Sequence, residues 1–230
     1  MSMDTEIQNW ASNKAPVFII EDDDDKVKLA KAKKLGLVKQ LAAGIYTCDI
    51  STSIENLVYK NIWKLITLAY GTSIVSRRSA LFGGMIVDNT VDITVFSKKK
   101  SMKLGRFTIQ TLNGPNPLNG DNFFAENIFI SSIPRTLVEL AVYLADNQKL
   151  TIPKKALIES EVHDWLNKNY DADKKSKIQD LNFKAHVLLT ENFSIYTKNI
   201  RTTEKILNNL LDFEPSVKRK KLTEDDLKFY

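Results

Sequence analysis

A long amphipathic helix followed by three strand-like segments is the feature that most limits the folds open to this chain. Apolar residues recur at helical spacing over residues 52–70, and Gly71 ends the pattern. Thr52 and Glu55 have the spacing of a capping box at the start of this helix. Strand-like segments rich in β-branched and aromatic residues follow at 91–97, 106–113 and 127–133. This combination predicts an α+β domain with a short sheet.

The first 48 residues predict a smaller unit of their own. Helical patterns over 4–13 and 26–36 flank a short extended segment, and Gly36 is a typical helix stop signal. Two short β-prone runs then surround a small-residue turn that ends in Gly44, as in a hairpin. The order helix, helix, hairpin is typical of a winged-helix unit. We expect this head to end at the polar segment 49–53.

The chain beyond the α+β domain is expected to be helical. Helical patterns cover about 154–168, 175–190 and 202–212, and the basic run "VKRKK" follows at 217–221. We therefore expect three parts: a winged-helix-like head over 1–48, an α+β domain over 49–150, and a helical C-terminal part with a basic tail over 151–230.

Composition limits the environment and the partners of the chain. Its 230 residues contain 43% hydrophobic residues, enough for an ordinary core, and carry a net charge of +5, which permits a nucleic-acid or acidic partner without requiring one. Cys48 is the single cysteine, so no internal disulfide can form. No secretory signal or apolar run of membrane-spanning length is present, and we expect a cytoplasmic protein without a membrane association.

Four lysines are candidates for DNA contacts. Three lie on the helix predicted over 26–36 and one lies in the hairpin, where they could meet phosphates. The alternative is a solvated helix face whose charge is balanced by the preceding "EDDDD" run at 21–25. The candidates are Lys28, Lys31, Lys34 and Lys39.

Two arginines stand where a helix start normally prefers acidic residues. Ser76 has the character of an N-cap, and Arg77 and Arg78 follow it directly. Their guanidinium groups are suited to a phosphate or carboxylate, which makes them candidates for an anion or partner site. The alternative is that one of them pairs with a carboxylate elsewhere in the fold. Arg135, in another first helical turn, is expected to pair with an acidic group of the α+β domain.

The residues do not favour an enzyme. Asp92 is followed two positions later by Thr94, so a strand with two metal-binding carboxylates is incomplete. His163 and His186 are isolated from each other and from Cys48, which makes a zinc site improbable. Neither the P-loop pattern nor the dinucleotide-binding pattern of glycines occurs. We expect no catalytic activity, no cofactor and no bound metal.

The order of several short motifs resembles the AbiEi-type antitoxin family of type IV toxin–antitoxin systems. The motifs are "AAGIYT" at 42–47, "IVSRRSAL" at 74–81, "DITVF" at 92–96 and "IPRTLVELA" at 133–141. The resemblance covers roughly residues 5–145. It implies a winged-helix head that binds operator DNA and represses its own operon. It also implies a second domain that helps to antagonise a nucleotidyltransferase-like toxin.

A second hypothesis needs no DNA. The chain would then be a protein-interaction or regulatory N-terminal module of a longer effector, for example one with a Fic-type domain. The sequence of such a domain does not occur within these 230 residues. The operator, the toxin and the oligomeric state do not follow from the sequence.

Overall fold

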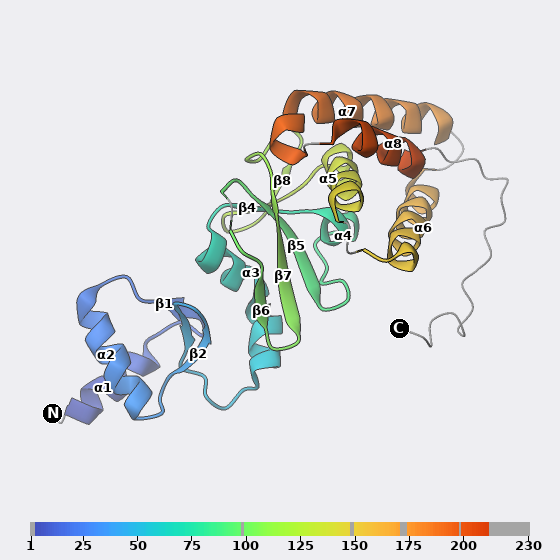
Figure 1. The fold of residues 1–230 in the computed structure, drawn as a ribbon. Coiled ribbons are helices and arrows are strands. Elements are labelled where there is room, and N and C mark those ends of the chain that lie inside the picture. Colours follow the sequence, from blue (N-terminus) through green and yellow to red (C-terminus); the bar gives the residue numbers. More distant parts are fainter. Residues whose placement is uncertain (1–2, 98, 148–149, 171–173, 198, 212–230) are drawn as a thin grey trace, which may run out of the picture.

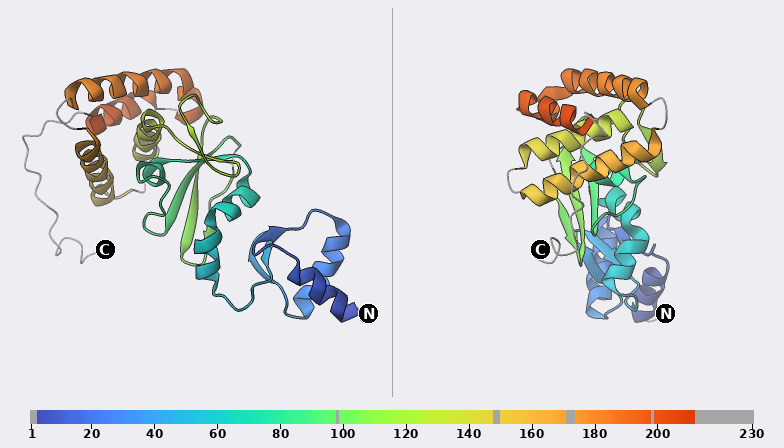
Figure 2. Two further views of the ribbon diagram at one scale, coloured as in Figure 1. Left: turned by 180° about the vertical axis from the view of Figure 1, so that it is seen from behind. Right: turned by 90° about the vertical axis from the view of Figure 1, so that its right-hand side faces the viewer.

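The computed structural model describes residues 3–97, 99–147, 150–170, 174–197 and 199–211. Over these residues the chain has an α+β fold, with a small N-terminal head, a central body built on a mixed sheet, and helices that follow the body (Figure 1). The head and the last helices lie at opposite ends of the body in all views (Figure 2). The basic run at 217–221 lies outside the described residues.

The head consists of two helices and a three-stranded antiparallel sheet. The sheet has the order β1-β3-β2, which confirms the predicted hairpin. Ile7, Phe18, Leu29, Ala32 and Val38 form its buried core. Among the described residues, one helix lies between β1 and the hairpin, so the head lacks the helix pair of a helix-turn-helix. Its elements are α1 (Met3–Ser12), β1 (Phe18–Ile19), α2 (Asp23–Lys34), β2 (Lys39–Ala42) and β3 (Ile45–Thr47).

The acidic run at the start of α2 has a structural role. Asp22 is the N-cap, and its carboxylate accepts a hydrogen bond of 2.6 Å from the backbone N–H of Asp25. Asp25 turns toward α1, where it accepts a hydrogen bond of 2.7 Å from the indole of Trp10 and pairs with Lys14. The contact with Lys14 lowers the pKa of the Asp25 carboxyl. These aspartates therefore start α2 and fasten it to α1.

The body is built on a six-stranded sheet with the order β6-β7-β5-β4-β9-β8. The pairs β5–β7 and β4–β9 are parallel, and the other three pairs are antiparallel. The predicted segments 106–113 and 127–133 contain β7 and β9, and 91–97 covers β5 except for its first residue, while the other three strands are not predicted from the sequence. The strands are β4 (Ser73–Val75), β5 (Thr90–Val95), β6 (Met102–Leu104), β7 (Phe107–Asn113), β8 (Asn122–Ala125) and β9 (Ile128–Ile130).

The central strand β5 presents different chemistry on its two faces. Val91, Ile93 and Val95 pack in one apolar cluster with α3 (Ile54–Tyr70). The alternate residues Asp92 and Thr94 contact α4 (Arg77–Leu81) and α5 (Ile133–Asp146) on the other face. The N-cap of α3 is Ser53, whose hydroxyl accepts from the N–H of Asn56, so the helix is capped one residue later than the predicted capping box of Thr52 and Glu55.

Three further helices follow α5. They are α6 (Ile152–Asn169), α7 (Lys174–Tyr196) and α8 (Ile200–Leu211). Of these three helices, α7 and α8 pack against α5, while α6 contacts α4 and α8. Their apolar residues form one buried cluster with those of α5. His163 is buried, and its Nε2 lies 3.2 Å from the carbonyl oxygen of Asn209 on α8. The helical prediction for this part is confirmed within the described residues.

The head is fastened to the body by its hairpin. Val17 and Ile45 are buried in the same cluster as the apolar face of α3. In the connection, Asp49 accepts hydrogen bonds from the N–H of Thr52 and the hydroxyl of Ser51. Hydrogen bonding with the side chain and the backbone of Thr52, and to a smaller extent with Ser51, lowers the pKa of the Asp49 carboxyl to about 2. The connecting segment thus has a defined turn, and the head has a defined orientation on the body.

The close approach at Gly114 gives a test of the packing between β5 and the C-terminal helices. A Cβ at this position would lie 2.6 Å from Cγ2 of Thr94 and 3.2 Å from a ring carbon of Tyr196. We therefore expect Gly114→Ala to lower the free energy of unfolding by about 1–3 kcal/mol, measured by urea denaturation. Gly83→Asn is the control, because open space surrounds Gly83 and Asn tolerates its positive φ. Equal effects of the two substitutions would contradict the close approach.

Candidate functional site

The exposed face of α2 is the part of the head that best fits a nucleic-acid interface. Leu29 and Ala32 bury the opposite face of this helix. Lys31 is half-buried and Lys34 is exposed, and both border a shallow surface hollow. The residues around this hollow, which we call the α2 face, are Lys26, Val27, Ala30, Lys31 and Lys34. The structure therefore brings two of the four predicted lysines together on one surface.

The other two predicted lysines lie elsewhere. Lys28 is half-buried on the flank of the helix, where its charge contributes to the lowered pKa of the Asp25 carboxyl. Lys39 donates hydrogen bonds from Nζ to the carbonyl oxygens of Thr52 at 2.6 Å and Ile50 at 3.4 Å. Lys39 thus holds the connection to the body and is not part of the α2 face.

Two members of the α2 face were missed from the sequence. Lys26 forms an exposed pair with Asp23, with 2.6 Å between Nζ and Oδ1. Val27 has 57% of its surface exposed. The spacing of 26, 30 and 34 is four residues, which places these positions on one helix face. Counting back from Lys34 in steps of four residues would have found Lys26. Counting in steps of three instead leads to Lys28, which lies on the flank of the helix.

Arg77 is an internal residue. Only 2% of its surface is exposed, and Nη2 lies 2.7 Å from Oδ1 of Asp92. The same nitrogen donates to the carbonyl oxygen of Gln110 at 3.2 Å, and the guanidinium lies over the ring of Tyr143. Burial raises the pKa of the Asp92 carboxyl. The positive φ of 47° at Arg77 is a strained backbone conformation that this ion pair helps to hold.

Arg78 also has its partners inside the chain. Its Nε and Nη2 donate to the two carboxylate oxygens of Glu161 on α6, at 2.7 and 2.6 Å. Nη1 lies 2.8 Å from Oδ2 of Asp88. This two-pronged contact is the strong form of an Arg–carboxylate pair.

These contacts correct the expectation that Arg77 and Arg78 form an anion or partner site. Both guanidinium groups face carboxylates of the chain, because folding places Asp92 next to Arg77 and Glu161 next to Arg78. A cavity of about 260 Å³ lies beside them, and its charged lining residues are Arg77, Arg78, Asp88, Asp92 and Lys154. Ser76 occupies the N-cap position without a side-chain hydrogen bond to the helix. The pair of arginines connects α4 to β5 and to α6.

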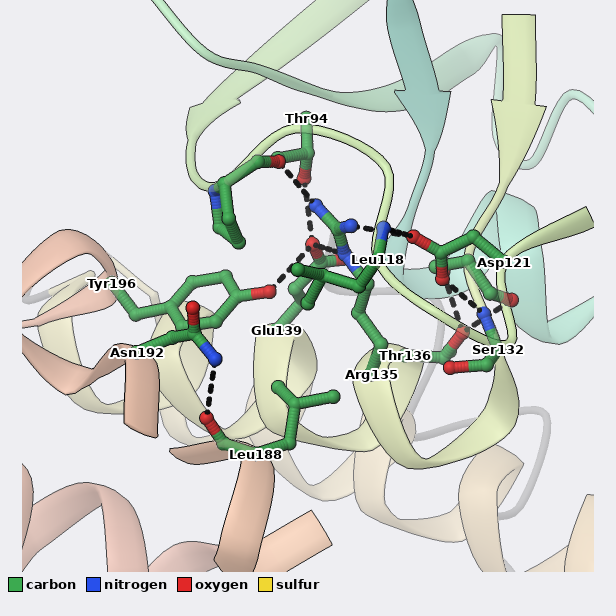
Figure 3. Close-up of polar contacts among 12 residues, drawn as sticks. Thr94, Leu118, Asp121, Ser132, Arg135, Thr136, Glu139, Leu188, Asn192 and Tyr196 are labelled. Atoms are coloured by element: carbon green, nitrogen blue, oxygen red, sulfur yellow. Dashed lines mark hydrogen bonds and ion pairs between the residues drawn. The ribbon is translucent and has the colours of Figure 1, made fainter. Parts of the chain in front are cut away.

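Arg135 is the centre of a larger buried network between the sheet and α5 (Figure 3). Its Nη1 lies 2.6 Å from Asp121 and its Nε lies 2.9 Å from Glu139, and all three side chains are fully buried. The carbonyl oxygens of Pro115 and Asn116 accept its other hydrogen bonds. The prediction that Arg135 pairs with acidic groups of the α+β domain is confirmed.

Glu139 receives three donors on one oxygen. Its Oε1 accepts from Arg135, from the hydroxyl of Thr94 at 3.0 Å and from the hydroxyl of Tyr196 at 3.4 Å. The other oxygen, Oε2, is buried without a hydrogen-bond partner. Burial raises the pKa of this carboxyl, and a proton on Oε2 would cost none of the three hydrogen bonds. The network joins β5, α5 and α7 through one carboxylate.

Comparison with known proteins adds no relative: the chain matches no family model and no curated protein. The resemblance to AbiEi-type antitoxins therefore rests on the short motifs quoted above. Within the part of the chain that the structure describes, no three His, Cys, Asp or Glu residues are grouped so that they could hold a metal ion. None of the described helices has the length and apolar character needed to cross a bilayer.

The ion pair of Arg77 makes a prediction about stability. Arg77→Met removes the partner of buried Asp92 and should lower the free energy of unfolding by about 3–5 kcal/mol. Adding Asp92→Asn should recover part of this loss, because the unpaired charge is then gone. Arg78→Met should cost less, since Arg78 and Glu161 keep partial access to water. Denaturant unfolding of the wild type and these three variants measures these differences. A double variant no more stable than Arg77→Met alone would contradict the pairing.

The raised pKa of Glu139 predicts a pH dependence. The pKa of the Glu139 carboxyl is higher in the folded protein than in the unfolded chain, because burial disfavours its charged form. The unfolded chain therefore loses this proton at lower pH, and the free energy of unfolding falls as pH rises through the folded-state pKa. Glu139→Gln removes this titration and keeps an oxygen that can accept from Thr94. We expect the stability of wild type relative to Glu139→Gln to fall as pH is raised from about 4 to about 8. A difference that is constant or rises with pH would contradict this assignment.

Proposed function

We propose that this protein is a DNA-binding transcriptional regulator of antitoxin type, whose head contacts operator DNA through the α2 face. The observation that carries the proposal is the group of lysines at Lys26, Lys31 and Lys34 on the exposed side of α2. Lysines on one helix face neutralise phosphates and supply affinity that falls with salt. The cytoplasm is the compartment in which such a regulator would act.

The charges along α2 determine how the helix approaches the duplex. Asp23 and Asp24 are exposed in the first turn, whereas Lys31 and Lys34 lie in the last turns. In a helix-turn-helix protein the N-terminal residues of the recognition helix contact the bases. Here the acidic first turn opposes that approach, so the C-terminal half of α2 faces the phosphates. We infer that backbone contacts dominate this interface and that sequence selectivity is modest.

The antitoxin part of the proposal comes from the motif resemblance. It assigns the body the role of antagonising a nucleotidyltransferase-like toxin, with the operon of the two genes as the regulated target. One observation also favours the interaction-module hypothesis. Val27 is 57% exposed in the middle of the α2 face, and an apolar residue surrounded by lysines equally suits an acidic protein surface.

Charge reversal on α2 tests the DNA-binding proposal. Lys31→Glu combined with Lys34→Glu should abolish binding to duplex DNA from upstream of the gene, because two phosphate contacts are replaced by repulsion. Binding is measured by fluorescence anisotropy as a function of salt. Wild type should show a steep loss of affinity with salt, and each single substitution to Gln should reduce the slope of log K against log salt by about one.

Two exposed lysines on α6 provide a matched control. Lys154→Glu combined with Lys168→Glu changes the net charge of the protein by the same amount, and both positions lie far along the chain from the head. This variant should bind DNA nearly as wild type does. Absence of wild-type binding at low salt would exclude the DNA-binding proposal, and equal losses in the two double variants would show that only overall charge matters.

A further inference from the structure

The two edges of the six-stranded sheet differ in how they are covered. At one edge, β6 is in contact with β2 of the head and carries the charged Lys103. At the other edge, β8 pairs with β9 on one side, and no strand among the described residues pairs with its outer side. The sequence of β8 is Asn-Phe-Phe-Ala, without a charge or a proline. The strand is four residues long and its register with β9 shifts between Phe123 and Ala125, but its uncharged outer side still offers N–H and C=O groups to another strand.

The side chains of β8 make this edge both rigid and apolar. Phe124 packs edge-to-face on Trp63 of α3 with 4.9 Å between ring centroids, and its ring lies where a Cβ on Gly84 would be. Phe123 points to the other face, where it contacts Phe129 and remains 68% exposed. The strand is therefore fixed from one face while a large apolar side chain remains in water on the other.

A second exposed apolar region is a groove next to the loop that leads into β8. It has a volume of about 490 Å³ and lies between α7 and the loop that leads into β8. Phe183 of α7 lines it and is 69% exposed, and Val187, one helical turn further along, is 39% exposed. Lys184 and Glu191 also line the groove, so its polar groups carry both signs of charge. Large exposed apolar side chains in a groove are typical of a site of protein association.

We propose that a second copy of this chain occupies this surface, with β8 pairing antiparallel to β8 of the other copy across a two-fold axis. Two identical antiparallel edges are complementary to each other, since each supplies the N–H and C=O groups that the other lacks. Phe123 and Phe183 of each copy lose contact with water in this arrangement. The mixed charges of the groove also suit a self-complementary interface, whereas a strongly charged partner would favour a single sign.

The position of β8 leaves the heads free. Figures 1 and 2 place β8 near the C-terminal helices, at the end of the body away from the head. Pairing through β8 therefore gives a dimer with two outward heads, which matches the inverted half-sites bound by dimeric regulators. In this last respect the inference rests on the proposed function. The dimer itself depends only on the edge and the groove.

Sedimentation equilibrium of the full chain without DNA tests the dimer. Wild type should show a monomer–dimer equilibrium in the micromolar range, and Phe123→Asp should raise its dissociation constant about 30-fold or more. Phe183→Asp should have an effect in the same direction, and it tests the interface independently if the substitution on β8 disturbs folding. Phe96→Asp is the matched control, because Phe96 is similarly exposed at 61% and lies outside the patch. Circular dichroism verifies that each variant is folded.

The outcomes separate this inference from the proposed function. A wild-type chain that stays monomeric at about 100 μM, or a dimer that folded Phe123→Asp and Phe183→Asp leave unchanged, would overturn the proposed interface. Lys31→Glu with Lys34→Glu should retain the dimer, since α2 is not part of this surface. A dimer without DNA binding would refute only the proposed function. A monomer that binds a half-site duplex would refute only the dimer.

Discussion

The buried charge of Arg135 is the interaction on which the architecture of the body depends. Water does not reach this guanidinium, so the protein must surround it with acceptors. Glu139 supplies one from the same helix, one turn along, while Asp121 and two backbone carbonyls come from the segment between β7 and β8. One charge thereby fixes the path of that segment across the start of α5. Since the segment leads directly into β8, it also fixes the outer edge of the sheet.

The two faces of the sheet are held to their helices by different interactions. On the α3 face, every second residue of β5 is apolar and packs against α3. Burial of this apolar surface stabilises the fold without requiring one particular arrangement of the helix. On the α5 face, Asp92 and Thr94 require partners at defined positions, Arg77 and Glu139. Ionic and hydrogen-bonded contacts of this kind add little net stability but penalise any other packing. We infer that the apolar face drives collapse and the polar face selects the arrangement of α4 and α5.

The elements that could be predicted from the sequence are those with a clear local pattern of apolar residues. Helices 26–36 and 52–70, the hairpin and strand β5 follow from local periodicity, and all are present. Strands β4 and β6 have three residues each, too few for alternation to be recognised. Two of the three lysines of the α2 face were predicted, and Lys39 was misplaced, because spacing places a residue on a helix or strand but not against a neighbouring segment. Glu161, which binds Arg78 through both carboxylate oxygens, lies 83 residues away, a distance that no local pattern spans.

The way in which the head is attached to the body bears on the proposed function. Lys39, a candidate for DNA contact from its sequence, instead donates to carbonyl oxygens of the connection, and Val17 and Ile45 enter the cluster of α3. A head on a flexible linker would adapt to many spacings between two DNA half-sites. A head fixed by a buried apolar contact and a hydrogen-bonded turn has one orientation relative to the sheet. In the proposed dimer joined through β8, the fold of the body would set the distance between the two α2 faces, and the half-sites of the proposed operator would have to match that distance.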